Sequence, residues 1–327
     1  MNTTSKLNPI QFNQIIYLMH RIRLIQMLCS LFPPIISQRL RNYLYPWKIN
    51  NNNFSYSKRA ITGSIFKSTI DDYHGYRFLF HGFFDWRNII IANSLFEINK
   101  GDIIEIGANI GTETISLCDI ARGKGIVHAF EPYLPNYNHL VELLKTQNNL
   151  KLYHLAISDK NGVVSFEEPP ESQSGVGKII TESQNSQNEL LRIKTKKLDY
   201  FIEDFKNIQL ITIDTEGHEP HVLQGSEKII EHYSPLVIIE VSPQLLSKYS
   251  NSSPRDIKTF FLDKGYKVFK ISRFSIRDIE ESDLRTHKSV NWICVHNKNS
   301  GILKKIKRDL LYRTLIPWYL LPALKKV

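Results

Sequence analysis

Residues 102–114 read Asp-Ile-Ile-Glu-Ile-Gly-Ala-Asn-Ile-Gly-Thr-Glu-Thr, a short apolar run followed by a turn that contains two glycines. The run is typical of a strand buried on both faces of a sheet. Gly107 and Gly111 let the backbone turn tightly and approach a ligand closely, and Asn109 between them is the non-glycine residue type that best tolerates a positive φ. Because residues 112–121 have helical periodicity, this stretch predicts a strand–turn–helix unit.

Strand and helix patterns continue to alternate after this unit. We expect strands at 126–130, 150–157, 209–213 and 236–241, and helices at 135–146 and 219–230. This alternation predicts an α/β fold with a doubly wound, largely parallel sheet, whose ligands bind at the carboxyl ends of its strands. Two later apolar runs, 267–271 and 290–295, predict an antiparallel pair at one edge, which brings the expected number of strands to seven.

The composition divides the chain into three parts. For residues 1–75 we expect a basic, apolar and helical extension that includes a linker. The linker is indicated by the Asn tract at 50–53 and by the stretch bearing Ser and Lys that follows it up to Ile70. Residues 76–298 predict the main domain, in which a polar, strand-poor segment with a Ser-, Gln- and Asn-rich run at 183–188 follows the third strand. Residues 299–327 predict a basic amphipathic tail that is also helical.

The positive charge lies at the two ends of the chain. The net charge is +10, but residues 1–70 contain nine Lys or Arg and no acid, and residues 298–327 contain eight Lys or Arg and one acid, which leaves −6 for residues 71–297. A nucleic-acid-binding body would be basic, so we expect no nucleic acid partner. The three cysteines are far apart without a CxxC pair, which excludes a zinc ribbon and favours a reducing, cytoplasmic location.

Both ends are also rich in large apolar residues. The run from Ile15 is interrupted by the basic cluster 20–23 and by Pro33-Pro34 before it reaches the ~20 apolar residues of a spanning helix. Aromatic residues and leucines lie between basic residues in 310–321. Two interpretations remain open, namely peripheral contact with the anionic inner face of a membrane and packing on the domain as cap helices.

Glu131 closes the second predicted strand, 24 residues after Gly107. A carboxylate at this place can accept hydrogen bonds from ribose hydroxyls, which both nicotinamide dinucleotides and S-adenosylmethionine carry. The dinucleotide fingerprint G-x-G-x-x-G is absent, and Glu105 would repel a pyrophosphate but attract the cationic amino-acid end of S-adenosylmethionine. The sequence therefore favours S-adenosylmethionine, with a nicotinamide-dependent oxidoreductase as the alternative.

Four motifs together carry a family resemblance. They are Glu-Ile-Gly-Ala-Asn-Ile-Gly-Thr-Glu-Thr at 105–114, Ala-Phe-Glu-Pro at 129–132, Ala-Ile-Ser-Asp at 156–159 and Ile-Asp-Thr-Glu-Gly-His-Glu at 213–219. In order and spacing the chain resembles the FkbM-type S-adenosylmethionine-dependent methyltransferases over roughly residues 80 to 296. The most specific part is the motif at 213–219.

The resemblance implies a Rossmann-like, class I methyltransferase sheet with S-adenosylmethionine at the glycine turn. Ser158 and Asp159 correspond to positions near the adenine in related enzymes. Thr212 and Thr215 depart from the family, which often has Lys and Val there. The cofactor-binding residues that the resemblance and the charge pattern indicate are Glu105, Gly107, Asn109, Gly111, Thr114, Glu131, Ser158 and Asp159.

The resemblance also implies methyl transfer to an oxygen, commonly a hydroxyl of a sugar or a secondary metabolite. An aliphatic hydroxyl needs a general base, and the catalytic candidates are Asp214, Glu216 and His218. His218 is the first choice because its unperturbed pKa of ~6.5 suits proton transfer near neutrality, and Asp214 is the second. A divalent cation on these groups is left open.

Three further residues have two interpretations each. Glu219, followed by Pro220, is more typical of a helix start than of catalysis. Glu240 is either an acceptor contact or a buried, hydrogen-bonded carboxylate. Trp86 belongs to the core or covers the acceptor, and the core is the more frequent place for it.

The expected partner is a small-molecule or glycan acceptor, which would be lipid-linked if the basic ends bind a membrane. An RNA acceptor is the alternative that the negative charge of the body disfavours.

Overall fold

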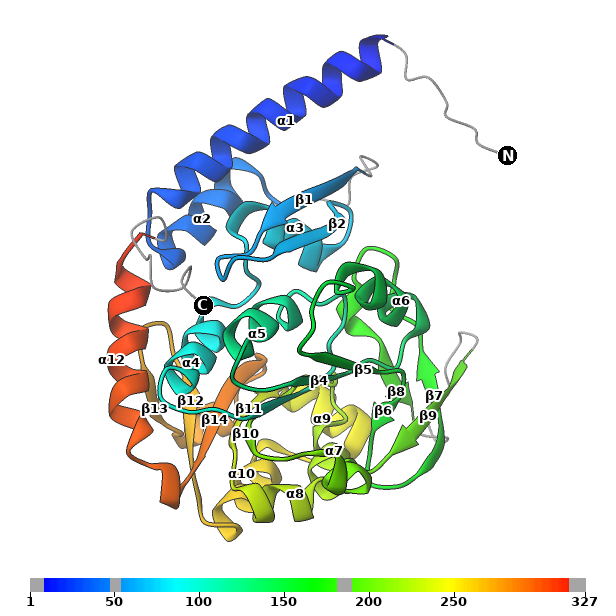
Figure 1. The fold of residues 1–327 in the computed structure, drawn as a ribbon, viewed down its shortest axis with the longest axis vertical. Helices are drawn as coiled ribbons and strands as arrows, with labels where there is room; N and C mark the ends of the chain where they lie inside the picture. Colours follow the sequence, from blue (N-terminus) through cyan, green and yellow to red (C-terminus); the bar gives the residue numbers. More distant parts are fainter. Residues whose placement is uncertain (1–8, 48–53, 181–189, 318–327) are drawn as a thin grey trace.

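The computed structural model describes residues 9–47, 54–180 and 190–317 (Figure 1). The predicted Asn tract at 50–53, the polar run at 183–188 and the end of the predicted tail from residue 318 lie outside the described residues.

The main sheet has eight strands within the described ranges. In spatial order they are β13 (Ile276–Asp278), β12 (Tyr266–Ile271), β14 (Val290–His296), β11 (Leu236–Val241), β10 (Ile208–Ile213), β3 (Asp102–Ile106), β4 (Val127–Phe130) and β5 (Leu150–Tyr153). Neighbouring strands from β11 to β5 are parallel, and β14 lies antiparallel between β11 and β12. The doubly wound α/β prediction and the antiparallel pair are confirmed. The three-residue strand β13 adds to the seven predicted strands, because so short a segment has no detectable period.

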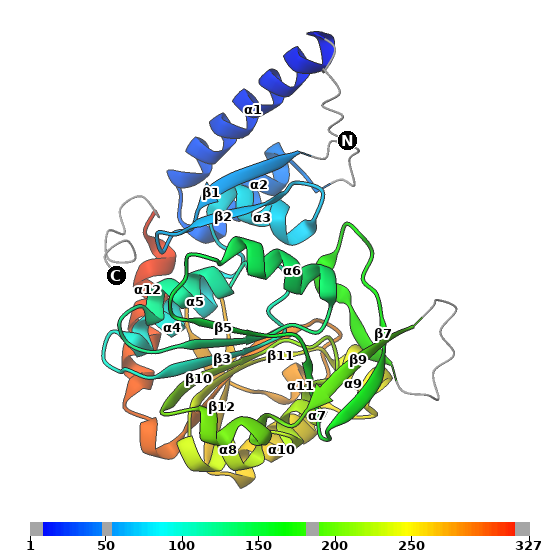
Figure 2. The same ribbon diagram turned by 45° about the vertical axis from the view of Figure 1, so that its right-hand side comes forward.

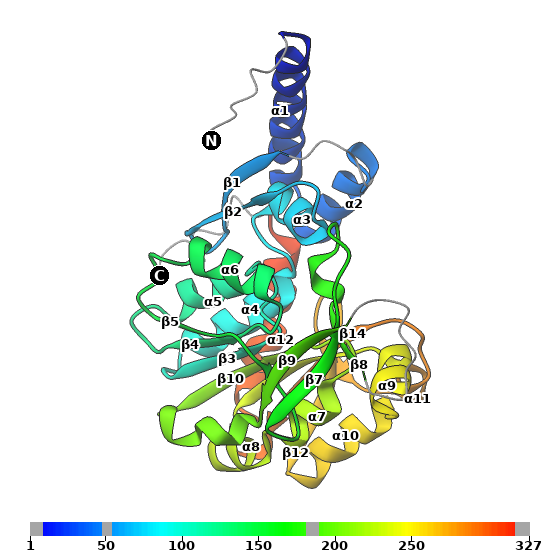
Figure 3. The ribbon, with the colours of Figure 1, turned by 90° about the vertical axis from the view of Figure 1, so that its right-hand side faces the viewer.

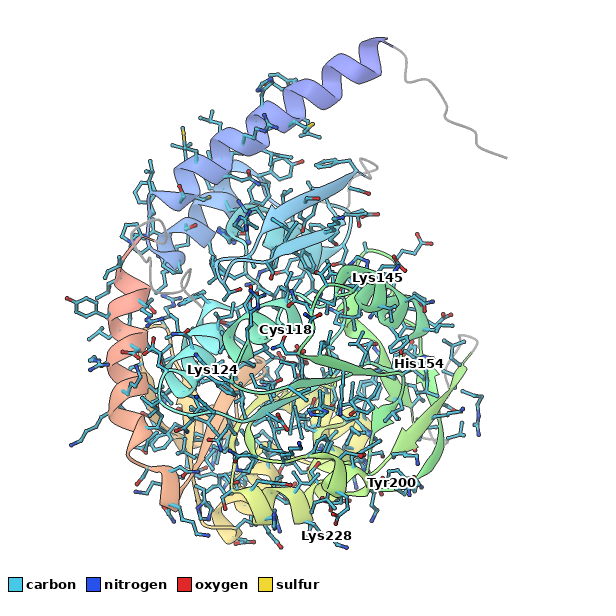
Figure 4. The ribbon with its side chains drawn as sticks, viewed as in Figure 1. Cys118, Lys124, Lys145, His154, Tyr200 and Lys228 are labelled. Atoms are coloured by element: carbon cyan, nitrogen blue, oxygen red, sulfur yellow. The ribbon has the colours of Figure 1, made fainter. Side chains whose placement is uncertain are left out.

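Helical layers cover both faces of this sheet (Figure 1). On one face α4, α5 and α12 bury apolar side chains against β3 and β14, and on the other face α7 to α10 pack on β10 and β11. Figure 4 shows side chains filling the spaces between these layers. The bounds of the helices are α4 (Trp86–Phe96), α5 (Thr114–Ala121), α6 (Leu134–Leu143), α7 (Glu219–Gln224), α8 (Glu227–Tyr233), α9 (Pro243–Ser250), α10 (Pro254–Asp263), α11 (Glu281–Leu284) and α12 (Ile302–Leu315).

Two predicted elements are each divided in the structure. The predicted strand 150–157 forms β5 and then β6 (Ala156–Ile157), which belongs to a different sheet. The predicted helix 219–230 breaks between α7 and α8 at Gly225, where an added Cβ would lie 1.9 Å from the carbonyl oxygen of Ser158. The close approach of these two backbones requires the glycine, and periodicity alone does not show it.

The prediction that 158–208 is poor in strands is wrong. The described residues form a second sheet with the order β6, β9 (Leu191–Lys196), β7 (Gly162–Glu167) and β8 (Lys178–Ile180), which Figure 3 shows beside the main sheet. Strand β9 alternates between buried and exposed residues, as expected for a strand with one solvated face. Because β9 is mostly polar, this short alternation was not recognised as a strand in the sequence.

The predicted linker up to Ile70 is also structured. Residues 55–69 form an antiparallel hairpin of β1 (Ser55–Arg59) and β2 (Ile65–Thr69), and α3 (Tyr73–His81) crosses the expected boundary at residue 75. Helices α1 (Pro9–Ser30) and α2 (Pro34–Leu44) precede the hairpin, and Figure 2 shows α1 extending away from the sheet. No helix in the described ranges is both long and apolar enough to cross a membrane.

Helix α12 packs on the outside of α4. Ile306 and Leu310 of α12 are fully buried, and Asp309 accepts a hydrogen bond from Ser94 on α4 at 2.8 Å. The described part of the predicted tail is therefore a cap on the main domain.

This packing predicts unequal effects at two adjacent leucines. Leu310→Ala is expected to lower the free energy of unfolding by about 2–5 kcal/mol, because the side chain is fully buried. Leu311→Ala is the matched control and should change it by at most about 0.5 kcal/mol, since Leu311 is 48% exposed. Urea denaturation measures both values. Equal stabilities of the two variants would contradict the packing of α12 on the core.

Candidate active site

Two adjoining cavities lie at the carboxyl ends of β3, β4, β10 and β11. The larger has a volume of about 520 Å³. Gly107, Asn109 and Asp214 line both cavities, together with His74 from α3. The site is therefore where the order of the sheet reverses on either side of β3, the usual place for ligands in such sheets.

In the turn after β3, every second residue has a positive φ angle. Gly107, Asn109 and Gly111 have φ values of +90°, +50° and +86°. A Cβ on Gly107 would lie 1.8 Å from the carbonyl oxygen of Asp214, and one on Gly111 would lie 2.7 Å from Leu140 Cδ2. Gly107 thus lets the ends of β3 and β10 meet, while Gly111 lets α6 pack closely.

Glu131 lies at the smaller cavity, after β4. Its Oε2 accepts a hydrogen bond from the Asn109 amide at 2.7 Å and its Oε1 accepts one from the Tyr133 amide at 2.9 Å. Burial nevertheless raises the pKa of Glu131 to about 7. Each carboxylate oxygen has a further lone pair, so the group can accept hydrogen bonds from a pair of ligand hydroxyls.

The walls of the smaller cavity beside Glu131 are largely apolar. Ile157 and Ile179 line it together with the rings of Tyr133 and Phe166, which stack with centroids 6.0 Å apart. A flat, apolar group such as an aromatic base matches these surfaces.

Glu105 lines the larger cavity and is 4% exposed. Its Oε2 has no hydrogen-bond partner among the described residues. Burial raises the pKa of Glu105 to about 8, and the charges of Glu131 and Asp214 add to the effect. Burial likewise raises the pKa of Glu113, which lines the same cavity, well above its ordinary range. A ligand cation would favour the ionised form of both carboxyls.

Basic side chains also line the larger cavity, but most of them are paired. Arg87 forms an ion pair with Asp85. Lys270 and Arg277 both contact Asp283, at 2.7 and 2.6 Å. The positive charge of these three residues is thus largely balanced by neighbouring carboxylates.

Asp214 follows β10 and forms a cluster with Glu216 and Glu240. One carboxylate oxygen from each lies within 4.8 Å of the others. Burial and the charge of Glu219 raise the pKa of Asp214 to about 7, and repulsion from Asp214 raises the pKa of Glu240 well above its ordinary range. A side-chain hydrogen bond joins Asp214 and Glu240, which lowers the pKa of Asp214 and raises that of Glu240. Oxygen ligands in this number also suit a hard divalent cation.

His218 lines only the smaller of the two cavities in the described structure. Its Nε2 is 2.9 Å from the hydroxyl of Ser158, and its ring stacks on that of His221. Burial and the neighbouring His221 lower the pKa of His218 to about 3. A histidine in this environment is a weak base, and it is separated from the larger cavity.

The sequence pattern of the Methyltransferase FkbM domain matches residues 105–268. The chain belongs to this FkbM family. The match begins within β3, ends within β12 and includes Glu105, Glu131, Asp214, Glu216 and Glu240, whereas α1, α2, the β1–β2 hairpin and α12 lie outside it.

A curated relative of this FkbM domain is the 2-O-methyltransferase NoeI of Sinorhizobium fredii (strain NBRC 101917 / NGR234). The two sequences are 26% identical over 153 residues. The matched region covers 42% of this chain and 62% of the relative. The chain thus spans about three fifths of the length of the relative that it matches.

Solved structures with similar folds include a methyltransferase FkbM from Methylobacillus flagellatus KT, with a TM-score of 0.41 and 15% identity over 60% of this chain and 43% of that one. A second is SMU.1697c, a putative methyltransferase from Streptococcus mutans in complex with SAH. Its TM-score is 0.37 and its identity 11%, over 62% of this chain and 94% of that one.

Within the FkbM domain, the structure gathers only part of the predicted residue set at the cavities. The predicted residues that line them are Glu105, Gly107, Asn109, Glu131, Asp214, Glu216 and His218. Gly111, Thr114, Ser158 and Asp159 line neither cavity as far as the structure is described. Ser158 instead donates a hydrogen bond to Asp159 at 2.9 Å, so these two polar side chains satisfy each other beside His218.

The three residues with two interpretations now have defined surroundings. Glu219 accepts hydrogen bonds from the amides of Thr215 and Gly217 and begins α7, which agrees with the helix-start interpretation. Glu240 lines the larger cavity and is also hydrogen-bonded. Trp86 is buried in the core, and its Nε1 donates to Thr314 Oγ1 at 3.2 Å.

Sequence reasoning missed the cavity residues that lie outside the family motifs. His74 and Arg77 come from α3, ahead of the FkbM domain. The ring of His74 lies 2.9 Å from the Asn109 amide group, and Asn136 from α6 donates to the Asn109 side-chain oxygen at 3.1 Å. A polar residue in a helix does not by itself indicate a binding site. Only the folded structure therefore identifies His74 and Arg77 as cavity residues.

Proposed function

We propose that the protein transfers the methyl group of S-adenosylmethionine to a hydroxyl oxygen of a saccharide-type acceptor. The observation that carries the proposal is the set of buried carboxyls around the Gly107 turn, above all Glu105 and Asp214, with raised pKa values. Such a set disfavours a pyrophosphate and stabilises a cation. S-adenosylmethionine is the methyl donor that brings both a sulfonium and an ammonium group.

The residues present fit this cofactor in three respects. Glu131 has free lone pairs for the two ribose hydroxyls, and Tyr133 and Phe166 provide surfaces for the adenine. Glu105, which has an unpartnered oxygen among the described residues, would receive the amino-acid end. The bound cofactor supplies a methyl group activated by positive sulfur.

Asp214 is the base in this proposal, because it lines the larger cavity and its pKa lies near neutrality. As the acceptor oxygen forms its bond to the methyl carbon, the bond from that carbon to sulfur breaks and its electron pair stays on sulfur. The hydroxyl proton passes to the Asp214 carboxylate. Glu240, which shares a hydrogen bond with Asp214, orients that carboxylate.

The acceptor class rests on the family relative and on the chemistry of the cavity. The matched relative is named a 2-O-methyltransferase. Polar side chains that can hydrogen-bond to sugar hydroxyls, such as Asn88 and Asn291, line the larger cavity beside the carboxylates.

One binding measurement tests the cofactor, and two activity measurements test the acceptor and the metal. Calorimetry with S-adenosylmethionine and with NADH should show binding of the first alone, and binding of NADH alone would overturn the proposal. Transfer of labelled methyl to free or lipid-linked glycans tests the acceptor. Loss of that transfer in EDTA and its return with Mg²⁺ would show that a divalent cation is required, for which Asp214, Glu216 and Glu240 are the candidate ligands.

Glu131→Gln is expected to weaken the binding of S-adenosylmethionine about ten- to hundredfold, because hydrogen bonds to a charged group are lost. Glu142→Gln is the matched control, since Glu142 is exposed and paired with Lys145 on the surface. Calorimetry measures both dissociation constants. Equal values for the two variants would remove Glu131 from the ribose site.

A further inference from the structure

Helix α1 has two different apolar sides. Ile22, Ile25 and Cys29 are buried in a cluster with residues of α3. On the opposite side Leu24, Met27 and Leu31 are 53%, 56% and 49% exposed. Figures 1 and 3 show that α1 extends beyond the rest of the molecule, so the described elements leave this second side uncovered.

Three of the exposed residues form one continuous apolar row, and Tyr17 lies on the same side beyond the exposed polar residues His20 and Arg21. Tyr17, Leu24, Met27 and Leu31 are separated by seven, three and four residues, a spacing that places them on one side of a helix. We call these four residues the outer face of α1. Within α1 the outer face from Tyr17 to Met27 is ~15 Å long, and Leu31 directly follows the last residue of the helix, Ser30. Single exposed apolar residues are ordinary, but a continuous exposed stripe marks an interaction surface.

The charges on α1 and on the adjoining helix α2 indicate the partner of the outer face. Arg23 is exposed on α1, four residues before Met27, and Arg39 is exposed on α2. Residues 1–70 contain no acidic residue at all. Two copies of α1 packed together would bring only positive charges face to face, whereas an anionic phospholipid surface accepts both the apolar stripe and the arginines.

We propose that the outer face of α1 docks on an anionic phospholipid surface. The four apolar side chains enter the layer below the headgroups, and Arg23 and Arg39 contact lipid phosphates. The helix lies along the surface and does not span the bilayer. This surface lies outside the matched domain at 105–268, so the inference does not depend on the proposed methyl transfer.

Vesicle co-sedimentation tests this proposal with the full chain. The protein is expected to bind vesicles of phosphatidylglycerol and phosphatidylcholine in equal parts, to bind much less to phosphatidylcholine alone, and to dissociate as salt is raised. The triple variant Leu24→Ser, Met27→Ser, Leu31→Ser should lose this binding. Arg23→Gln and Arg39→Gln should each weaken it about fivefold.

A matched triple variant separates the outer face of α1 from general surface hydrophobicity. Ile98, Val163 and Leu262 are 62%, 50% and 49% exposed at other places, and changing all three to Ser should leave vesicle binding intact. Thermal unfolding shows that each variant is folded.

Three results would overturn the proposal: no binding of the wild type to the anionic vesicles, equal loss of binding in both triple variants, or a wild-type dimer in solution that the outer-face variant converts to monomer. The last result would identify a second copy as the occupant.

Discussion

In the Asp214→Asn variant, kcat for methyl transfer is expected to fall by about 10²–10⁴. The amide cannot accept the hydroxyl proton, although it keeps the size of the carboxylate. Steady-state kinetics with the acceptor at saturation measure the effect. His218→Ala is the informative comparison, because His218 lines only the smaller cavity among the described residues. Its kcat should stay within about threefold of the wild type, which is under ~1 kcal/mol of barrier.

The pH dependence of the wild type follows from the same assignment. A base works in its deprotonated form, and burial raises the pKa of Asp214 to about 7. The rate should therefore be nearly constant above pH ~7 and fall as the pH decreases below it, as the carboxylate takes up a proton. The residual activity of Asp214→Asn should lack this decrease. A large loss in His218→Ala, with Asp214→Asn active, would instead return the role of base to the histidine.

Gly107→Ala should abolish S-adenosylmethionine binding. The new Cβ would lie 1.8 Å from the carbonyl oxygen of Asp214, so β3 and β10 must separate at the centre of the site. A backbone oxygen cannot move aside as the end of a side chain can. Calorimetry measures the binding, and urea denaturation should show a stability loss of more than about 2 kcal/mol.

Gly123→Ala is the control for the cost of φ alone. Gly123 also has a positive φ, +70°, but an added Cβ there has no heavy atom within 4 Å in the described structure. Only the conformational cost of about 1–2 kcal/mol applies, and cofactor binding should be unchanged. Normal binding in Gly107→Ala would show that the turn can widen and that it does not define the site.

The order of strands and helices could be predicted because strands buried on both faces consist mostly of apolar residues. Ile103, Ile104 and Ile106 of β3, for example, are all buried. The carboxylates at the strand ends could be predicted for the same reason, since the end of a strand fixes where the next side chain lies. This is why Glu105 and Asp214 both line the larger cavity.

Other parts of the site depend on contacts distant in the sequence. The intrinsic pKa of histidine made His218 the first choice of base, but burial beside Ser158, 60 residues earlier, gives it a much lower pKa. His74 reaches Asn109 from α3, 35 residues away. No local pattern reports such contacts, so the burial of His218 and the approach of His74 to the cavities could not be predicted from the sequence.

The position of β14 has a consequence for synthesis of the protein on the ribosome. This strand is formed by residues 290–296, yet it lies inside the sheet and joins β12 to β11. A nascent chain that has reached only residue 289 has β12 and β13 but no strand to hold them against β11. The sheet therefore closes only after residue 296 has left the ribosome tunnel, and until then the edge of β11 is open to chaperones or to pairing with other nascent chains.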